Sequence, residues 1–431
     1  MAQSIVSPAT LPSLRVRRPT YPEFSLEEYS QRNASCQAIL REKGIDALFV
    51  TMYENVEWLS GFGSESWKVY DKEWWVVVPA HGQPALTVDA IHEGNVEGTC
   101  VYQDVRIWGI QGKTVVDRLV EIFQDLELED KCVAIEYGHG TRLFMPACDW
   151  DEIKRRLPHV RWVDGAEVLG EMRMIKSSEE IARIREANRI TCHGIQAAFN
   201  GFHYGMSERD LVGLLMQHML EQGADATVPG TGCYLALSAG RINQITPRTV
   251  AARKIAKGDL VHVDGGCTYR GYYSDVYRVG IVDAEPHPFI ERCAATVSEA
   301  LDTVIDSIRP GVRSCELVAI AERIIEKNRM TKYIRTMTDA LTAESNSHSR
   351  LGHIGHGIGF GIHEYPFISH DVQMAWRENM VAAVEIMLGD PKIGWVEFED
   401  NIVVTKDGCE RITPLAKGLW RIKDGNGRHR P

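Results

Sequence analysis

Apolar and polar positions follow two periods along the first part of the chain. A capping box at Ser25 and Glu28 precedes apolar residues at helical spacing, which predicts an amphipathic helix that ends before Gly44. Short apolar runs predict buried strands at residues 45–51, 74–78, 85–88 and 132–136, and helical spacing recurs at 115–123. This alternation over residues 25–165 predicts an α/β domain.

The second part of the chain contains longer helices that indicate a repeat. Ser177 and Glu180 form another capping box ahead of a long helical pattern. Gly-led helix starts follow at Gly205 and Gly311, each after helical sequence. If the copies are related, this domain has pseudo-twofold symmetry with a site between its halves; a chance likeness is the alternative. We predict an N-terminal arm over residues 1–24, a domain over 25–170 and a second domain over 171–431.

Composition narrows the class of protein. A chain of 431 residues exceeds what one core usually organises. Acidic residues outnumber Lys and Arg by 59 to 48, and no basic run is long enough to follow a phosphate backbone, so we expect no nucleic-acid partner. The ten cysteines form no CxxC pair, and no apolar stretch has the length of a membrane helix. We expect reduced thiols, a cytoplasmic location and no membrane partner, although the Arg-rich arm leaves a targeting role open.

Residues 257–278 contain the first candidate chemistry. They predict two strands joined by a turn at Arg270 and Gly271, and on the first strand His262 and Asp264 share a face. Such a hairpin brings Asp264 and Asp275 side by side. Two carboxylates in an apolar strand pair repel each other unless a cation lies between them, which indicates a metal site. Two solvated acids at strand ends are the alternative.

Three later segments add candidate ligands. Residues 352–366 place five glycines around His353, His356 and His363, a pattern typical of a backbone that approaches a ligand closely, or of a flexible loop. Glu385 is a lone acid within the apolar run 381–388, and Glu399 lies among acids that lead into an apolar strand. Each acid alone is typical of a strand edge or turn. Together with a Gly-flanked histidine in one domain, they favour a metal site.

The order of these segments resembles the pita-bread metallohydrolases. The matching features are Asp264, Asp275, the Gly-His-Gly-Ile-Gly run around His356 with a His-Glu pair at His363, Glu385, and Glu399 followed by Asp400. That family includes methionine aminopeptidases, prolidases, Xaa-Pro aminopeptidases and the metal-free creatinase. The resemblance covers nearly the whole chain. It implies a creatinase/prolidase-like α/β N-terminal domain and an α+β pita-bread catalytic domain.

The resemblance also implies roles for individual residues. Asp264 would bind one metal ion, Asp275 and Glu399 would bridge two, and His356 with Glu385 would complete the second. Carboxylates with one imidazole suit two divalent transition metal ions, Mn, Fe, Co or Zn. Glu385 would also move a proton, and His363 would steady the charge that develops on the substrate. A homodimer and dipeptide-sized substrates are implied as well.

The sequence departs from the family pattern in two places. Ile386 follows Glu385 where the peptidases usually have proline, and residues 238–248 lack the usual histidine. Arg241 and Asn243 could replace that contact by holding a substrate carboxylate, or could only shape the loop. We add His353 as a third candidate substrate-binding residue.

These features predict a hydrolase of a small C–N bond, similar to an Xaa-Pro dipeptidase or aminopeptidase. A creatinase-like amidinohydrolase is one alternative. Dimethylsulfoniopropionate lyases share the fold, so metal-assisted cleavage of a sulfonium compound is another. The aromatic residues around Trp67, Trp74 and Trp75 would attract a methylated cation in that case, or would pack in the core.

Overall fold

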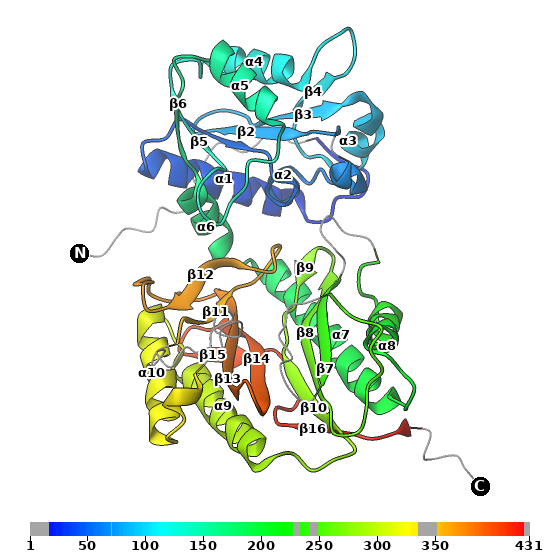
Figure 1. Ribbon diagram of the computed structural model, residues 1–431. Helices are drawn as coiled ribbons and strands as arrows, with labels where there is room; N and C mark the ends of the chain where they lie inside the picture. The colour runs from blue at the N-terminus through cyan, green and yellow to red at the C-terminus, as the bar shows by residue number, and fades with distance from the viewer. Residues whose placement is uncertain (1–16, 70, 227–232, 241–248, 335–350, 426–431) are drawn as a thin grey trace. The chain divides into compact units, whose positions relative to one another are not determined.

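The computed structural model describes residues 17–69, 71–226, 233–240, 249–334 and 351–425. The chain divides into two compact units, Met1–Met172 and Arg173–Pro431 (Figure 1). Each unit has its own sheets and its own core, so each is described by itself.

The first unit is built on one six-stranded mixed sheet with the order β4-β3-β2-β1-β5-β6. β1 pairs antiparallel with β2 and parallel with β5. The strands are β1 (Ala47–Val50), β2 (Trp75–Pro79), β3 (Ala85–Asp89), β4 (Asp104–Trp108), β5 (Cys132–Ile135) and β6 (Arg161–Asp164). The longer helices are α1 (Leu26–Glu42), α4 (Val115–Asp125) and α5 (Ala147–Arg156), and the shorter ones are α2 (Tyr53–Ser60), α3 (Glu93–Thr99) and α6 (Ala166–Met174).

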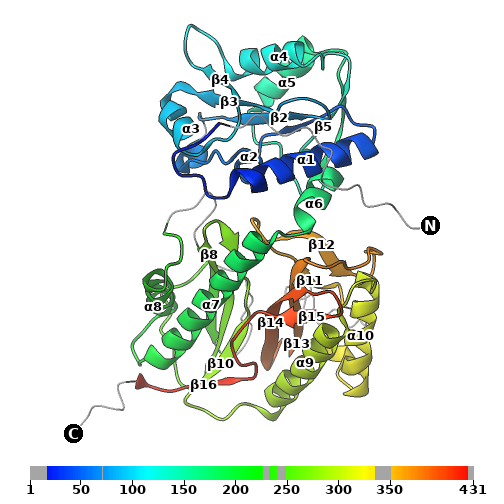
Figure 2. The same cartoon turned by 180° about the vertical axis from the view of Figure 1, so that it is seen from behind.

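Helices cover both faces of this sheet. α4 and α5 lie on one face and α1 on the other, as Figures 1 and 2 show. β1, β2, β3 and β5 are buried along their whole length, which explains why they read as continuous apolar runs. β4 and β6 were not predicted, because their residues are only half-buried or exposed and carry no apolar run. The α/β prediction for this part of the chain is confirmed.

The second unit consists of two halves with the same plan, which confirms the predicted pseudo-twofold symmetry. Each half pairs a long helix, a glycine turn and a shorter helix with a five-stranded sheet. The first half contains α7 (Ser178–Gly201), α8 (Glu208–Glu221), β7 (Cys233–Gly240), β8 (Leu260–Tyr269), β9 (Tyr272–Tyr273), β10 (Arg278–Val282) and β16 (Trp420–Ile422). The second contains α9 (Pro288–Ser307), α10 (Ser314–Lys327), β11 (His353–Gly357), β12 (Glu364–Ser369), β13 (Val381–Asp390), β14 (Gly394–Val404) and β15 (Cys409–Arg411).

The helices of the second unit pack on the outer faces of its sheets. α7 contacts β8, and α9 contacts β13 and β14. The two sheets meet where Tyr277 and Glu399 form an isolated antiparallel bridge. Every residue of β14 is buried, although the strand contains several acids. Buried acids need hydrogen-bond or ionic partners, so the region where the sheets meet must supply partners for the acids of β14.

The described helices include none that combines the length and the apolarity needed to cross a bilayer. All ten cysteines are free thiols, and most are buried as small apolar side chains.

Candidate metal centre

Asp264 and Asp275 are brought together by the hairpin that the sequence predicts. Arg270 and Gly271 form its turn with φ values of 49° and 83°, the left-handed conformation that a tight hairpin requires. Oxygen atoms of Asp264, Asp275 and Glu399 all lie within 4.8 Å of one another. The three residues are 9%, 3% and 2% exposed. Three carboxylates thus converge in a nearly dry space.

Glu385 joins this group through the pairing of β13 with β14. It stands directly opposite Glu399 in the antiparallel register, so both side chains project from the same face of the sheet. Nε2 of His353 lies 3.2 Å from Oε1 of Glu385. Burial opposes ionisation of Glu385, but the hydrogen bond from His353 and the nearby imidazoles outweigh it and lower the pKa of Glu385 to about 2. Glu385 is therefore a carboxylate at neutral pH.

His356 presents one ring nitrogen to the carboxylates. Its Nδ1 lies 3.0 Å from the carbonyl oxygen of Gly357, which can only accept, so Nδ1 carries the proton. Nε2 then has a free lone pair and lies 3.8 Å from both Asp275 and Glu399. Desolvation lowers the pKa of His356, which keeps the ring neutral. A neutral imidazole fixed by a carbonyl is the usual state of a metal-binding histidine.

His363 lies at the edge of the same cluster. Its ring stacks on that of His356 with centroids 3.8 Å apart, and Asp275, His356 and His363 form a second group within 4.8 Å. Glu364 holds this segment, because it accepts hydrogen bonds from the Gly361 amide at 2.7 Å and from Lys176 at 2.8 Å. The sequence analysis included Glu364 in the His-Glu pair at His363 but assigned it no role.

The glycines around His356 serve the packing of strands. A Cβ at Gly355 would lie 2.2 Å from the carbonyl oxygen of Ala383, and one at Gly357 would lie 2.7 Å from that of Tyr365. Both contacts are with the protein's own backbone. The interpretation that these glycines let the backbone approach a ligand is therefore wrong for these two positions, since the neighbouring strands fill the space.

The site fits a divalent cation, because buried carboxylate oxygens here lack partners. Oδ1 of Asp275 and Oε1 of Glu399 are fully buried and accept no hydrogen bond. Burial, followed by the neighbouring carboxylates, raises the pKa of Asp264 to about 7 and that of Asp275 and Glu399 well above their usual range. Among the described residues, no Lys or Arg forms an ion pair with these acids. The donor set therefore calls for an external cation, and oxygen with one imidazole suits a transition metal.

Glu397 is a further acid at this site that the sequence analysis did not assign. It is 5% exposed and lies two residues before Glu399 on β14, so both side chains project from the same face of the strand. Burial and the charge of Glu385 raise the pKa of Glu397 well above its usual value. The spacing of two residues between Glu397 and Glu399 within a predicted strand was the signal that could have identified it.

Two buried polar networks fix the ligand-bearing segments. Arg278 pairs with Asp400 at 2.6 Å, both fully buried, and also donates to the carbonyl oxygen of Glu399 at 2.7 Å. Asn401 accepts a hydrogen bond from the amide of Asp275 at 3.1 Å. Asp400 and Asn401 follow Glu399 directly on β14. Through these hydrogen bonds they position Asp275 and Glu399.

The remaining candidates lie elsewhere. Arg241 and Asn243 fall outside the described residues. Trp74 and Trp75 are 4% and 0% exposed within the first unit, so core packing is the correct interpretation and neither ring can receive a methylated cation.

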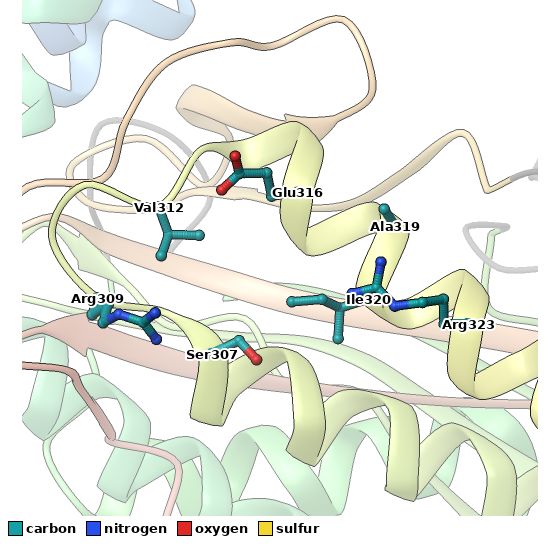
Figure 3. A pocket seen from close by; sticks show the side chains of 7 residues that line it. All are labelled: Ser307, Arg309, Val312, Glu316, Ala319, Ile320 and Arg323. Atoms are coloured by element: carbon teal, nitrogen blue, oxygen red, sulfur yellow. The ribbon is translucent and has the colours of Figure 1, made fainter.

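A separate surface cavity of about 350 Å³ lies between the end of α9 and α10 (Figure 3). Arg309 and Arg323 contribute its guanidinium groups, and Val312, Ala319 and Ile320 its apolar wall. It contains none of the predicted ligands, and its one acid, Glu316, forms an ion pair with Arg313. This cavity is therefore not the metal site.

Comparison with known proteins follows the same division of the chain. Residues 182–406 match the model for "Metallopeptidase family M24", and residues 32–175 match that for "Creatinase/Prolidase N-terminal domain". An Xaa-Pro dipeptidase of Pyrococcus horikoshii is 31% identical over 301 residues, 70% of this chain and 80% of the relative. An Xaa-Pro dipeptidase of Lactobacillus delbrueckii subsp. lactis is 24% identical, over 88% of this chain and 96% of the relative.

Solved structures share the fold over nearly the whole chain. An Xaa-Pro dipeptidase from Bacillus anthracis superposes with a TM-score of 0.75 at 21% identity, covering 91% of this chain and 99% of that one. The prolidase from Pyrococcus horikoshii gives a TM-score of 0.71 at 24% identity, covering 90% and 99%. At these identities the likeness concerns the fold.

Proposed function

The chain belongs to metallopeptidase family M24 and carries a creatinase/prolidase N-terminal domain, and from this premise we propose that it is a metal-dependent dipeptidase acting on Xaa-Pro bonds. The observation that carries the proposal is the convergence of Asp264, Asp275 and Glu399 within 4.8 Å, with buried oxygens that lack partners. Relatives described as Xaa-Pro dipeptidases support the substrate class.

We assign the metal ligands to Asp264, Asp275, His356, Glu385 and Glu399, for two divalent transition metal ions. The unpartnered oxygens of Asp275 and Glu399 and the free Nε2 of His356 support this set. Glu385 is included because it stands opposite Glu399 in the strand register. We do not assign His363 as a ligand and propose that it lies beside the substrate, because it occupies the rim of the cluster.

A bound divalent ion supplies an activated water and polarises the scissile carbonyl. Glu385 is ionised and partnered by His353, so it can take a proton from the attacking water and deliver it to the leaving proline nitrogen. His363 has a neutral ring, because desolvation and His356 lower its pKa. Its single N–H can donate to the oxygen on which negative charge develops.

The two alternative activities are less well supported. The sulfonium lyase hypothesis depended on Trp67, Trp74 and Trp75 as a receptor for a methylated cation. Trp74 and Trp75 are buried, and the ring of Trp67 stacks on Tyr53 with centroids 4.2 Å apart. A creatinase-like amidinohydrolase works without metal in the family member that defines it, whereas this chain keeps every acid of the ligand set.

We further propose a cytoplasmic homodimer with domains at residues 25–170 and 171–431. The free thiols of all ten cysteines suit a reducing compartment. Val69, two residues after Trp67, is 48% exposed and offers an apolar contact for a partner subunit. Light scattering at assay concentration tests the dimer, which a fully active monomer would rule out.

Proline release by the purified chain tests the function. The protein is stripped with a chelator, reloaded separately with Mn, Fe, Co or Zn, and assayed on an Xaa-Pro dipeptide and its Xaa-Ala counterpart. We expect metal-dependent cleavage of the Xaa-Pro substrate, with label from heavy-oxygen water entering the new carboxylate. Asp275→Ala should be inactive, while Asp306→Ala, an exposed acid on α9, should behave like the wild type. Cleavage that persists in the chelated protein contradicts the proposal.

A further inference from the structure

The first unit contains a serine, a histidine and an aspartate joined by hydrogen bonds. Oγ of Ser64 lies 3.0 Å from Nε2 of His92, and Nδ1 of His92 lies 2.6 Å from Oδ1 of Asp89. Asp89 ends β3, His92 closes the short 3-10 helix Ala90–His92, and Ser64 caps another, Glu65–Lys68. None of these residues belongs to the metal centre of the second unit.

The hydrogen bonds favour one tautomer of His92. A carboxylate accepts only, so Nδ1 of His92 carries the proton that points at Asp89. In this tautomer Nε2 is an acceptor, to which the hydroxyl of Ser64 can donate. A second bond fixes the hydroxyl oxygen, which accepts from the amide of Ser66 at 3.1 Å. This is the arrangement in which a histidine removes a proton from a serine nucleophile.

The base is held rigidly, and the serine beside it is less buried. His92 and Asp89 are each 4% exposed. The rings of Trp74 and Phe62 contact the imidazole edge to face, with centroids 5.2 and 5.9 Å away. Oδ1 of Asp89 also accepts from the Ile91 amide at 3.0 Å, which fixes the carboxylate. Ser64 itself is half-exposed, unlike the two buried residues behind it.

We propose that Ser64 is the nucleophile of a second, metal-independent acyl-transfer site that accepts small activated esters. The Ser64 oxygen bonds to the acyl carbon as its proton passes to Nε2 of His92. The bond from that carbon to the ester oxygen breaks, and His92 gives the proton to the departing alcohol. Water then attacks the acyl-serine by the same route, which releases the acid and restores Ser64. Asp89, which also accepts from the Ile91 amide and lies 3.9 Å from Nζ of Lys72, is a positioning residue, because it acts on Ser64 through His92.

A capping role for Ser64 is the competing explanation, and the chain provides a matched reference for it. Ser25 caps α1 in the same unit, accepts from the Glu28 amide at 3.1 Å and is exposed. Among the described residues it has no histidine partner. A serine that only caps a helix should react like Ser25, whereas an activated nucleophile should react faster.

The test treats the chelated full-length protein with a fluorophosphonate probe and maps the modified peptides by mass spectrometry. We expect Ser64 to be labelled at least about tenfold faster than Ser25. His92→Gln should remove this difference, and Ser66→Ala should keep it. Hydrolysis of a nitrophenyl ester should persist in the chelated protein and disappear in Ser64→Ala, which should retain metal-dependent peptidase activity. Equal labelling of Ser64 and Ser25 in the wild type overturns the proposal even if His92→Gln does not fold.

Discussion

Asn401 holds Asp275 by both of its backbone polar groups. Its Oδ1 accepts from the amide of Asp275 at 3.1 Å, and its Nδ2 donates to the carbonyl oxygen of the same residue. Asn188 on α7 donates to Oδ1 of Asn401 at 3.0 Å. Asn401 lies on β14, in the second half of the unit, and Asp275 lies between β9 and β10, in the first half. One amide side chain therefore fixes the position of one ligand-bearing segment relative to the other.

Replacing Asn401 should therefore weaken metal binding although it ligates nothing. In Asn401→Ala, the buried N–H and carbonyl of Asp275 lose their partner, which should lower the free energy of unfolding by about 1–3 kcal/mol. Misplacement of Asp275 should weaken metal affinity about 10- to 100-fold, as is usual for residues that orient a ligand. Titration calorimetry of the chelated protein with Mn or Co measures the affinity.

The matched control for this variant is Asn328→Ala. Asn328 is half-buried and donates to Glu299 at 2.9 Å within the same unit, but it lies among α9 and α10 residues. It should lose some stability without losing metal affinity. Unchanged affinity in Asn401→Ala would show that Asp275 holds its position without the amide.

Removal of one site acid should have opposite effects on the metal-free and the metal-loaded protein. In Glu399→Gln, the neutral side chain removes the cost of burying a carboxylate and the repulsion from its neighbours, which together raise the pKa of Glu399. The melting temperature of the chelated protein should rise by about 2–4 °C for each kcal/mol of this cost removed. The further increase that metal produces in the wild type should vanish, because a ligand is missing. Calorimetry with and without metal measures both.

Glu326→Gln is the reference for that experiment, since Glu326 is an exposed acid on α10. It should leave both melting temperatures unchanged. A chelated Glu399→Gln protein that melts below the wild type would mean that Glu399 is stabilised, rather than opposed, by its surroundings.

Local signals in the sequence predicted elements that one or two residues determine. Ser177 and Glu180 predict the start of α7, and both hydrogen bonds of the capping box are present. Arg270 and Gly271 predict the turn after β8, and both have positive φ. In each case the physical cause lies within a few neighbouring residues, so the sequence contains all of the information.

Partners that lie far apart in the chain could not be predicted in this way. The bond between Asn401 and Asp275 and the pair of Arg278 with Asp400 form only because two sheets meet. No periodicity in either segment encodes that meeting. Glu397 could be predicted only in part. Its face follows from that of Glu399, two residues along the same strand, while its burial depends on the opposite half of the unit.

The buried pair of Arg278 and Asp400 should show strong energetic coupling. Breaking it from one side leaves a buried charge with weaker compensation, because Asp400 keeps only Arg411, 3.1 Å away, and Arg278 keeps only carbonyl acceptors. Arg278→Met or Asp400→Leu should therefore each cost up to about 3–5 kcal/mol. The double variant should lose less than the sum, because both fully buried charges are gone and Arg411 keeps its pair with Asp302. Urea unfolding of the chelated protein gives the three values.

The exposed pair of Arg185 and Glu410, with atoms 2.5 Å apart, is the control for this cycle. Its side chains are 39% and 52% exposed, so its coupling should stay below about 1 kcal/mol. Additive losses at Arg278 and Asp400 would indicate that the arginine acts mainly through the carbonyl groups it binds.

The ionisable groups of the metal centre predict how stability depends on pH. An acid with a raised pKa in the folded protein binds more protons when folded, so stability falls as pH rises above its unfolded value. Asp264 lowers the stability of the folded protein in this way as pH rises to about 7. Asp275, Glu397 and Glu399, whose pKa values are raised further, continue to do so above that pH. The histidines whose pKa is lowered act in the opposite direction, but only below their unfolded value of 6.5.

The metal-free protein should therefore lose stability between pH 6.5 and pH 8.5, where the acids act without opposition from those histidines. Glu385, whose pKa is lowered to about 2, contributes stability that is constant in this range and is lost only in acid. Each group still binding a proton adds a slope of up to about 1.4 kcal/mol per pH unit. Metal should abolish the decline, because bound carboxylates are ionised already. Urea unfolding at several pH values measures both curves, and Asp275→Asn should flatten the metal-free one while Asp306→Asn leaves it unchanged. A metal-free protein whose stability rises over this range would mean that the site acids have ordinary pKa values and no need of a cation.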